Sequence, residues 1–278
     1  MHPLLSPETS TMLTLALYAA AGLCGLAGML VRSRPVRSAA AAAAVVGLAL
    51  QTVALATGFH ASTAGGLSIG AYLQMLAWFL VLTGTALRIF MKHNAPLIFA
   101  SVAALMLYGF SAPALQAVVK VPETLKAPFY ALHIGALFLS LALVGLAFAA
   151  GAVFLYLDGR IKAKLGLPAF IADMPALNIL DRINAIATAV GFPLYSIGMI
   201  CGLFYAGAVY GRTVTGDPKE IISFATWVLY AVLFHNRLAR GWYGRKPARL
   251  MVLIFILCAV SFVVVNLFMS SHHSFART

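Results

Sequence analysis

The feature that most constrains this chain is a series of apolar runs, each about as long as a membrane helix. About 20 apolar residues in a helix span the hydrocarbon core of a bilayer. Inside that core no water can pair with the backbone, so each run must be helical. The sequence therefore predicts an all-α integral membrane protein, a bundle of about eight transmembrane helices. The eight expected runs are 11–31, 38–59, 69–90, 95–118, 128–157, 185–209, 221–236 and 250–270.

Composition supports lipid as the solvent of most of the chain. Hydrophobic residues make up 62% of it and charged residues only 9%, whereas soluble domains carry roughly 25% charged residues. The longest connection, 158–184, is too short to fold as a separate domain. We therefore expect a single transmembrane domain over 1–278. Within 171–187, Leu177, Leu180 and Ile183 share one helical face, which predicts an interfacial helix leading into the sixth run.

The net charge of +12 has a topological interpretation. Of the 19 basic residues, 14 lie in alternate connections and so on one side of the membrane. Lysine and arginine collect on the cytoplasmic side, which places both termini on the outer, periplasmic side of a bacterial inner membrane. The same distribution excludes a nucleic-acid partner and leaves membrane lipid as the expected surroundings. The segment before the first run has no lysine or arginine, so that run is expected to remain as a helix rather than to act as a cleaved signal.

The three cysteines carry no metal or haem-attachment motif. Cys24, Cys201 and Cys258 lie inside the runs, and none belongs to a CxxC or CxxCH pattern. The chain is therefore not itself a c-type cytochrome, and its cysteines are expected to pack as small hydrophobic residues.

Histidines from three separate runs are expected on the outer side of the membrane. His60 ends the second run, His133 lies one turn into the fifth, and His272 and His273 follow the eighth. Imidazole is a common axial ligand of haem iron, and two such ligands must approach a porphyrin from opposite faces. The alternative interpretation is that these side chains are tolerated because they are near water.

His235 is a separate case, because it lies past the midplane of the seventh run. An ionisable group at that depth is costly and indicates a functional role. The alternative is a ring that bonds a neighbouring helix, or that reaches the inner interface beside Asn236 and Arg237.

Four stretches of the chain resemble the cytochrome c assembly family, the membrane proteins that handle haem during maturation of c-type cytochromes. They are MPALNILDRINAIATAVGFPLYSIGMICG, GDPKEIISFATWVLYAVLFHNRLARGW, VNLFMSSHHSF and, more loosely, ATGFHASTAGGLSIGAYLQMLAWF. The likeness is greatest to the CcsA/HemX-like branch and strongest over 60–275.

The resemblance implies roles for the histidines. His133 matches the first external histidine of the family, and either His272 or His273 matches the second. His133 and one of the pair His272 and His273 are thus the implied axial ligands of haem iron. His235 matches the family's membrane-embedded histidine, and His60 matches its early-loop histidine.

The haem loop departs from the family pattern. In full cytochrome c synthases it has the form WGxxWxWDPKE, and here it is YGRTVTGDPKE. Tyr210, Val214 and Gly216 replace the three tryptophans, so most of the flat apolar platform for a porphyrin is lost. The haem-binding framework is kept, while presentation of haem to an apocytochrome is in doubt.

The DPKE segment has two interpretations. Asp217 and Glu220 suit the positive N-terminal end of a helix, and Pro218 suits an early helical position. That account is sufficient for the local fold. The resemblance adds Lys219 and Arg212 as partners of the haem propionates.

We therefore expect a protein that binds haem b non-covalently and delivers or handles it at the outer face. Its partners would be haem, other cytochrome c assembly proteins or an apocytochrome, and catalysis by this chain alone is not expected. The alternative is a HemX-like regulatory or scaffold protein, linked to haem biosynthesis, that no longer delivers haem. A transporter is disfavoured because Asp and Glu are missing from the middle of every run.

Overall fold

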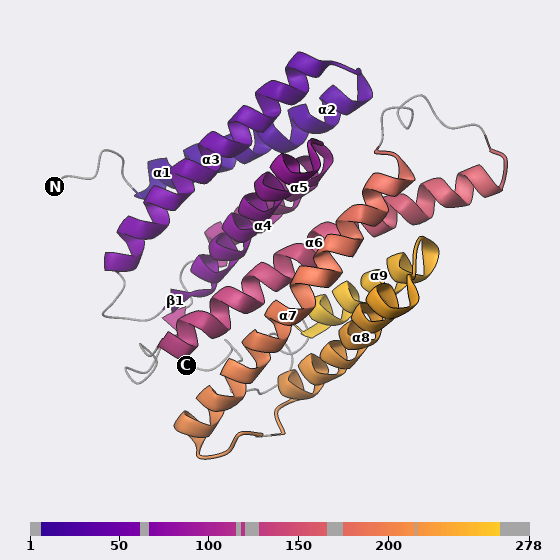
Figure 1. Ribbon diagram of the computed structural model, residues 1–278. Helices are drawn as coiled ribbons and strands as arrows, with labels where there is room; N and C mark the ends of the chain where they lie inside the picture. The colour runs from indigo at the N-terminus through magenta and orange to yellow at the C-terminus, as the bar shows by residue number, and fades with distance from the viewer. Residues whose placement is uncertain are drawn as a thin grey trace. The chain divides into compact units, whose positions relative to one another are not determined.

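The computed structural model describes residues 7–61, 67–114, 118–119, 128–165, 175–214 and 216–261 of the 278-residue chain. These residues are almost all helical (Figure 1), which confirms the all-α expectation. Six helices are long and apolar enough to cross a membrane, and the apolar helix Ala95–Ser111 is shorter. The chain divides into two compact units, Met1–Lys120 with Arg160–Pro175, and Val121–Gly159 with Ala176–Thr278.

The first unit begins with a helical segment that contains a π-helical turn. This segment consists of α1 (Pro7–Ala19), η1 (Ala20–Cys24) and α2 (Gly25–Leu30), and it packs against α3 (Arg34–Ala61). Figure 1 shows α1, α2 and α3 side by side. Helices α4 (Ile69–Met91) and α5 (Ala95–Ala114) form a closely packed pair. Two short strands, β1 (Leu67–Ser68) and β2 (Val118–Val119), pair in antiparallel fashion beyond the ends of these helices.

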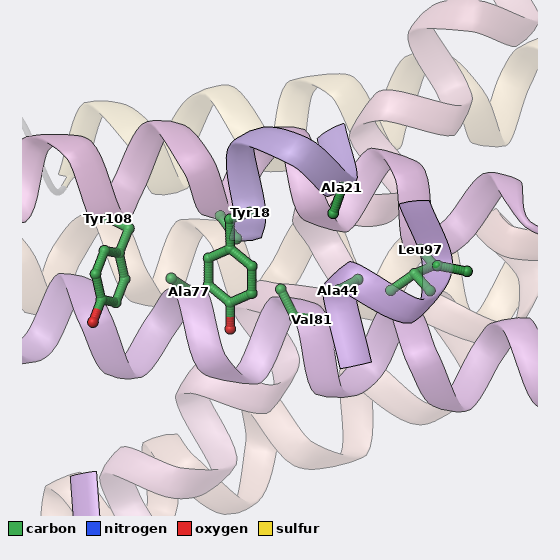
Figure 2. Packing of buried hydrophobic residues seen from close by; sticks show 9 residues of the cluster. Tyr18, Ala21, Ala44, Ala77, Val81, Leu97 and Tyr108 are labelled. Carbon is green, nitrogen blue, oxygen red and sulfur yellow. The ribbon is translucent and has the colours of Figure 1, made fainter. Parts of the chain in front are cut away.

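Small residues allow the helices of this unit to approach closely. Ala21, Ala44, Ala77 and Ala104 are almost fully buried. The rings of Tyr18 and Tyr108 belong to the same cluster (Figure 2) and meet edge to face, with their centroids 5.9 Å apart. Membrane helices favour such small residues because association in lipid depends on close packing. The alanine-rich start of α3 thus forms a packing face.

The second unit contains α6 (Pro128–Lys162), α7 (Leu177–Tyr210), α8 (Pro218–Arg240) and α9 (Arg245–Val260). At 34 residues, α7 is roughly 50 Å long, well beyond the roughly 30 Å of a hydrocarbon core. Its first turns include Asp181 and Arg182, so they extend past the apolar zone.

The helix expected to lead into the sixth run is present and is continuous with that run, because Leu177 to Tyr210 form one helix. The apolar face that predicted it is buried, since Leu180 and Ile183 are fully buried. Ala187 continues that face into the span without a break.

Candidate functional site

His133 lies in the second turn of α6 and is half-buried against α7. Its Nδ1 atom is 2.6 Å from the carbonyl oxygen of Gly198. A carbonyl oxygen accepts hydrogen bonds and cannot donate, so Nδ1 must carry the proton. In that neutral tautomer the lone pair is on Nε2, which is the state a metal-binding imidazole needs.

Glycines on α7 make room for this contact. A Cβ atom at Gly202 would lie 2.6 Å from Cε1 and 2.8 Å from Nδ1 of His133. A Cβ atom at Gly198 would lie 2.6 Å from Cγ of Leu137, one turn along α6. The ring of His133 therefore occupies the space that a side chain at position 202 would take.

The DPKE segment forms the N-terminal cap of α8. Asp217 is buried and caps the helix, accepting a hydrogen bond from the backbone N–H of Lys219 at 2.8 Å. Pro218 occupies the first turn, and Glu220 accepts from the backbone N–H of Gly216 at 3.2 Å. This reciprocal arrangement resembles a capping box, and it accounts for the local sequence without a ligand.

The predicted propionate partners differ in their surroundings. Lys219 is half-buried and within electrostatic range of His133, whereas Arg212 is exposed in the loop after α7. Tyr210 ends α7, and its side chain lies outside the described residues. Of the two predicted propionate partners, Lys219 is the one with an electrostatic interaction with His133.

His235 is exposed near the C-terminal end of α8. The opposite face of that helix, which includes Tyr230, Leu233 and Asn236, is buried. His235 lies 16 residues beyond Lys219, or roughly 24 Å along the helix axis. His133 and His235 therefore belong to two separate places in this unit.

The remaining predicted ligands are not described. His272 and His273 lie outside the described residues, and so does the side chain of His60 at the end of α3. Among the residues that the structure describes, no three His, Cys, Asp or Glu side chains form a group able to hold a metal ion. The pairing of His133 with the 272–273 segment stays a prediction.

Sequence reasoning missed a buried ion pair at the other end of α7 and α8. The Arg237 guanidinium donates to both carboxylate oxygens of Asp181, at 2.9 and 3.1 Å, and also to Asn184 Oδ1. Both charged side chains are more than nine-tenths buried. Gly244, between α8 and α9, donates its N–H to the same carboxylate. The available signal was an acidic residue just before one expected run and a basic residue just after another.

A second ion pair joins α6 to α9. Arg245, the first residue of α9, bonds the carboxylate of Asp158 near the end of α6. Both pairs connect elements distant in sequence, and both lie at the ends of helices rather than in their apolar middles.

The sequence matches the family described as Cytochrome C assembly protein over residues 67–273. The chain belongs to this cytochrome c assembly family. The match covers most of the second unit and the part of the first unit from β1 onward, and it confirms the family expected from the quoted motifs.

Individual members of the cytochrome c assembly family are similar over a shorter stretch. The chain is 35% identical over 113 residues to the cytochrome c biogenesis protein CcsA of Gloeothece citriformis, which is 38% of this chain and 34% of that protein. It is 37% identical over 113 residues to CcsA of Rippkaea orientalis, covering 38% and 33%. It is 34% identical over 97 residues to CcsA of Mesostigma viride, covering 35% and 32%. The match thus spans about a third of the length of these relatives.

Membership of the cytochrome c assembly family and the long apolar helices together identify a multi-pass membrane protein.

Proposed function

We propose that this chain holds haem non-covalently, as haem b, near the outer face of a bacterial inner membrane and passes it on during c-type cytochrome maturation. His133 is one axial ligand of the iron, and His272 or His273 is the other. Haem is the cargo here, and the protein supplies orientation rather than bond-making. The partners are other assembly proteins or an apocytochrome.

The observation that carries the proposal is the hydrogen bond from His133 Nδ1 to the Gly198 carbonyl. It fixes the tautomer whose Nε2 lone pair is available to iron. Such a second partner is what orients a histidine ligand at metal sites. Bound haem would supply the redox-active iron and two propionates, and we assign Lys219, which interacts electrostatically with His133, as the partner of one propionate.

The chain fits haem better than a small metal ion. The described residues provide one oriented imidazole and no cluster of three ligands. Haem iron needs only axial ligands, because the porphyrin supplies the other four. His235 and His60 remain candidates for further contacts with haem along its route.

The test is a haem titration of the full chain purified in detergent. We expect a Soret band on haem addition and at least a tenfold weaker affinity for His133→Ala. His93→Asn, which changes a histidine in the other unit, is the matched control and should bind as the wild type does. Wild-type affinity in His133→Ala would remove His133 from the site.

A second candidate function is favoured by the loop between α7 and α8. Position 214, where synthases carry a tryptophan, holds an exposed valine, and position 216 holds a glycine at φ 76°. This loop offers no indole surface at these two positions. A HemX-like regulatory protein linked to haem biosynthesis would need none. Gene deletion separates the two functions: loss of c-type cytochromes supports delivery, and altered haem precursors with normal cytochromes support regulation.

A further inference from the structure

Two side chains of α6 donate hydrogen bonds to glycine carbonyls of α7. His133 bonds Gly198 at 2.6 Å, and Ser140 bonds Gly191 at 2.8 Å. The donors are seven residues apart on α6, and the acceptors are seven residues apart on α7 in the opposite direction. The two bonds therefore share one antiparallel register, and the position of His133 follows from how the two helices pack.

Glycine is needed at the acceptor end of this contact for steric reasons. A Cβ atom at Gly198 would lie 2.6 Å from Leu137 Cγ, and one at Gly202 would lie 2.6 Å from His133 Cε1. Both distances are too short for two carbon atoms that are not bonded. A side chain at either position would have to displace Leu137 or the imidazole. Close approach of helix backbones at small residues is common in membranes, but here one of the groups in contact is a proposed ligand.

We propose that Gly198 and Gly202 are positioning residues for the His133 ligand. This inference rests on the proposed function. The Gly198 carbonyl holds the proton on Nδ1 and so leaves the Nε2 lone pair available to iron, and the missing side chain of Gly202 lets the ring lie in the orientation that makes this bond. The Nδ1–H···O=C bond also makes Nε2 a more basic ligand, which favours ferric haem over ferrous haem.

The steric part is tested with Gly202→Ala. In the protein without haem, nitrogen-15 NMR of labelled histidine should show the Nδ1–H tautomer for His133 in the wild type. It should show loss of that single tautomer in Gly202→Ala. Gly135→Ala is the matched control, because it lies two residues from His133 and a Cβ there would meet nothing within 4 Å. The same tautomer in wild type and Gly202→Ala would overturn the steric part.

The hydrogen-bond part is tested with His133→Gly, which leaves a space for an added ligand. Imidazole can bind iron and donate to the Gly198 carbonyl, whereas 1-methylimidazole can bind iron but has no N–H to donate. We expect imidazole to restore haem affinity and midpoint potential. We expect 1-methylimidazole to give about tenfold weaker haem binding and a more positive potential. Equal affinity and potential with the two ligands would overturn this part, even if Gly202→Ala fails to fold.

These outcomes separate the two levels of the proposal. If His133→Ala binds haem as tightly as the wild type, the proposed function fails at His133, and the NMR experiment still decides how the ring is held. If His133→Ala loses haem while Gly202→Ala keeps wild-type affinity, tautomer and potential, the ligand assignment stands and the positioning role fails.

Discussion

Asp181 and Arg237 are buried charged residues that are held by several hydrogen bonds. Asp181 receives two bonds from the Arg237 guanidinium and one from the Gly244 N–H. Arg237 additionally donates to the Trp242 carbonyl. Taking two such ions out of water is costly, and only good geometry with extra hydrogen bonds offsets the cost. This cluster therefore holds the first turns of α7 against the end of α8.

We expect Asp181→Asn to lower the free energy of unfolding by about 3–5 kcal/mol, because it leaves the Arg237 charge buried without a counter-ion. Thermal or denaturant unfolding in detergent measures the loss. Asp158→Asn is the comparison variant. Its partner Arg245 has a side chain 36% exposed, so the loss there should be about 1 kcal/mol or less. Equal losses in the two variants would contradict the special role of the Asp181 pair.

His93 lies in the connection just before α5. Its Nδ1 accepts a hydrogen bond from the backbone N–H of Ala95 at 3.1 Å. Burial, and to a lesser degree the Arg37 guanidinium, lower the pKa of His93 from its ordinary value of 6.5. The protonated ring has an N–H on both nitrogens and can no longer accept the Ala95 bond.

The lowered pKa gives a sign for the pH dependence. The unfolded chain binds the proton more readily, so the contribution of His93 to stability is present above about pH 6.5 and decreases as the pH falls below it. We expect the melting temperature to fall between pH 7.5 and 5.5, and to fall less in His93→Asn. Asparagine keeps an acceptor for the Ala95 N–H and does not titrate. An identical pH profile in this variant would rule out His93 as the cause.

At the level of helices, polar groups are paired across the first unit in a chain of hydrogen bonds. The Tyr18 hydroxyl on α1 donates to Gln51 of α3, which donates to the Gln74 carbonyl of α4. The Gln74 side chain then donates to Ser111 of α5. In a setting without water each unpaired polar group would cost several kcal/mol. These hydrogen bonds therefore set the register in which the four helices pack.

The close packing of α4 on α5 depends on Gly84. A Cβ atom there would lie 2.5 Å from Cβ of Ala100 and 3.1 Å from the carbonyl oxygen of Pro96. We expect Gly84→Ala to cost about 1–3 kcal/mol of unfolding free energy, since both neighbours are held by the α5 backbone. Gly109→Ala on α5, where a Cβ would meet nothing within 4 Å, is the control and should stabilise by up to about 1 kcal/mol. A Gly84→Ala protein as stable as the control would disprove the close contact.

For the whole molecule, the placement of basic residues predicts which ends of the helices face the cytoplasm. Labelling of single cysteines, in a chain whose three native cysteines are replaced, would test this orientation. Val214→Cys, in the loop between α7 and α8, should react with a membrane-impermeant maleimide in intact cells. Lys164→Cys, after α6, should react only when the membrane is opened. Both side chains are exposed, so reversed labelling would mean the opposite orientation.

The helices themselves were predictable from single residues and their neighbours in sequence. Hydropathy over about 20 residues is a local property, and among the described residues each expected run contains a helix. The part of the last run after residue 261 lies outside those residues. Helix ends were also readable where the chemistry is local, as at Asp217 and Pro218. The start of α7 at Leu177 could not be predicted in this way. A polar segment with one apolar face is typical both of a helix at the membrane interface and of a buried extension of the spanning helix.

The contacts of the candidate site required the tertiary structure. Nothing near His133 in the sequence indicates that its ring lies on Gly202 and bonds Gly198, and nothing near Asp181 indicates Arg237. The resemblance named His133 as a ligand, but its tautomer depends on an acceptor 65 residues away. That most of the chain is surrounded by lipid follows from its composition and does not depend on contacts between helices, so the sequence alone was enough to establish it. The state of an imidazole or a buried carboxylate is set by atoms from other helices, which only packing brings within bonding distance.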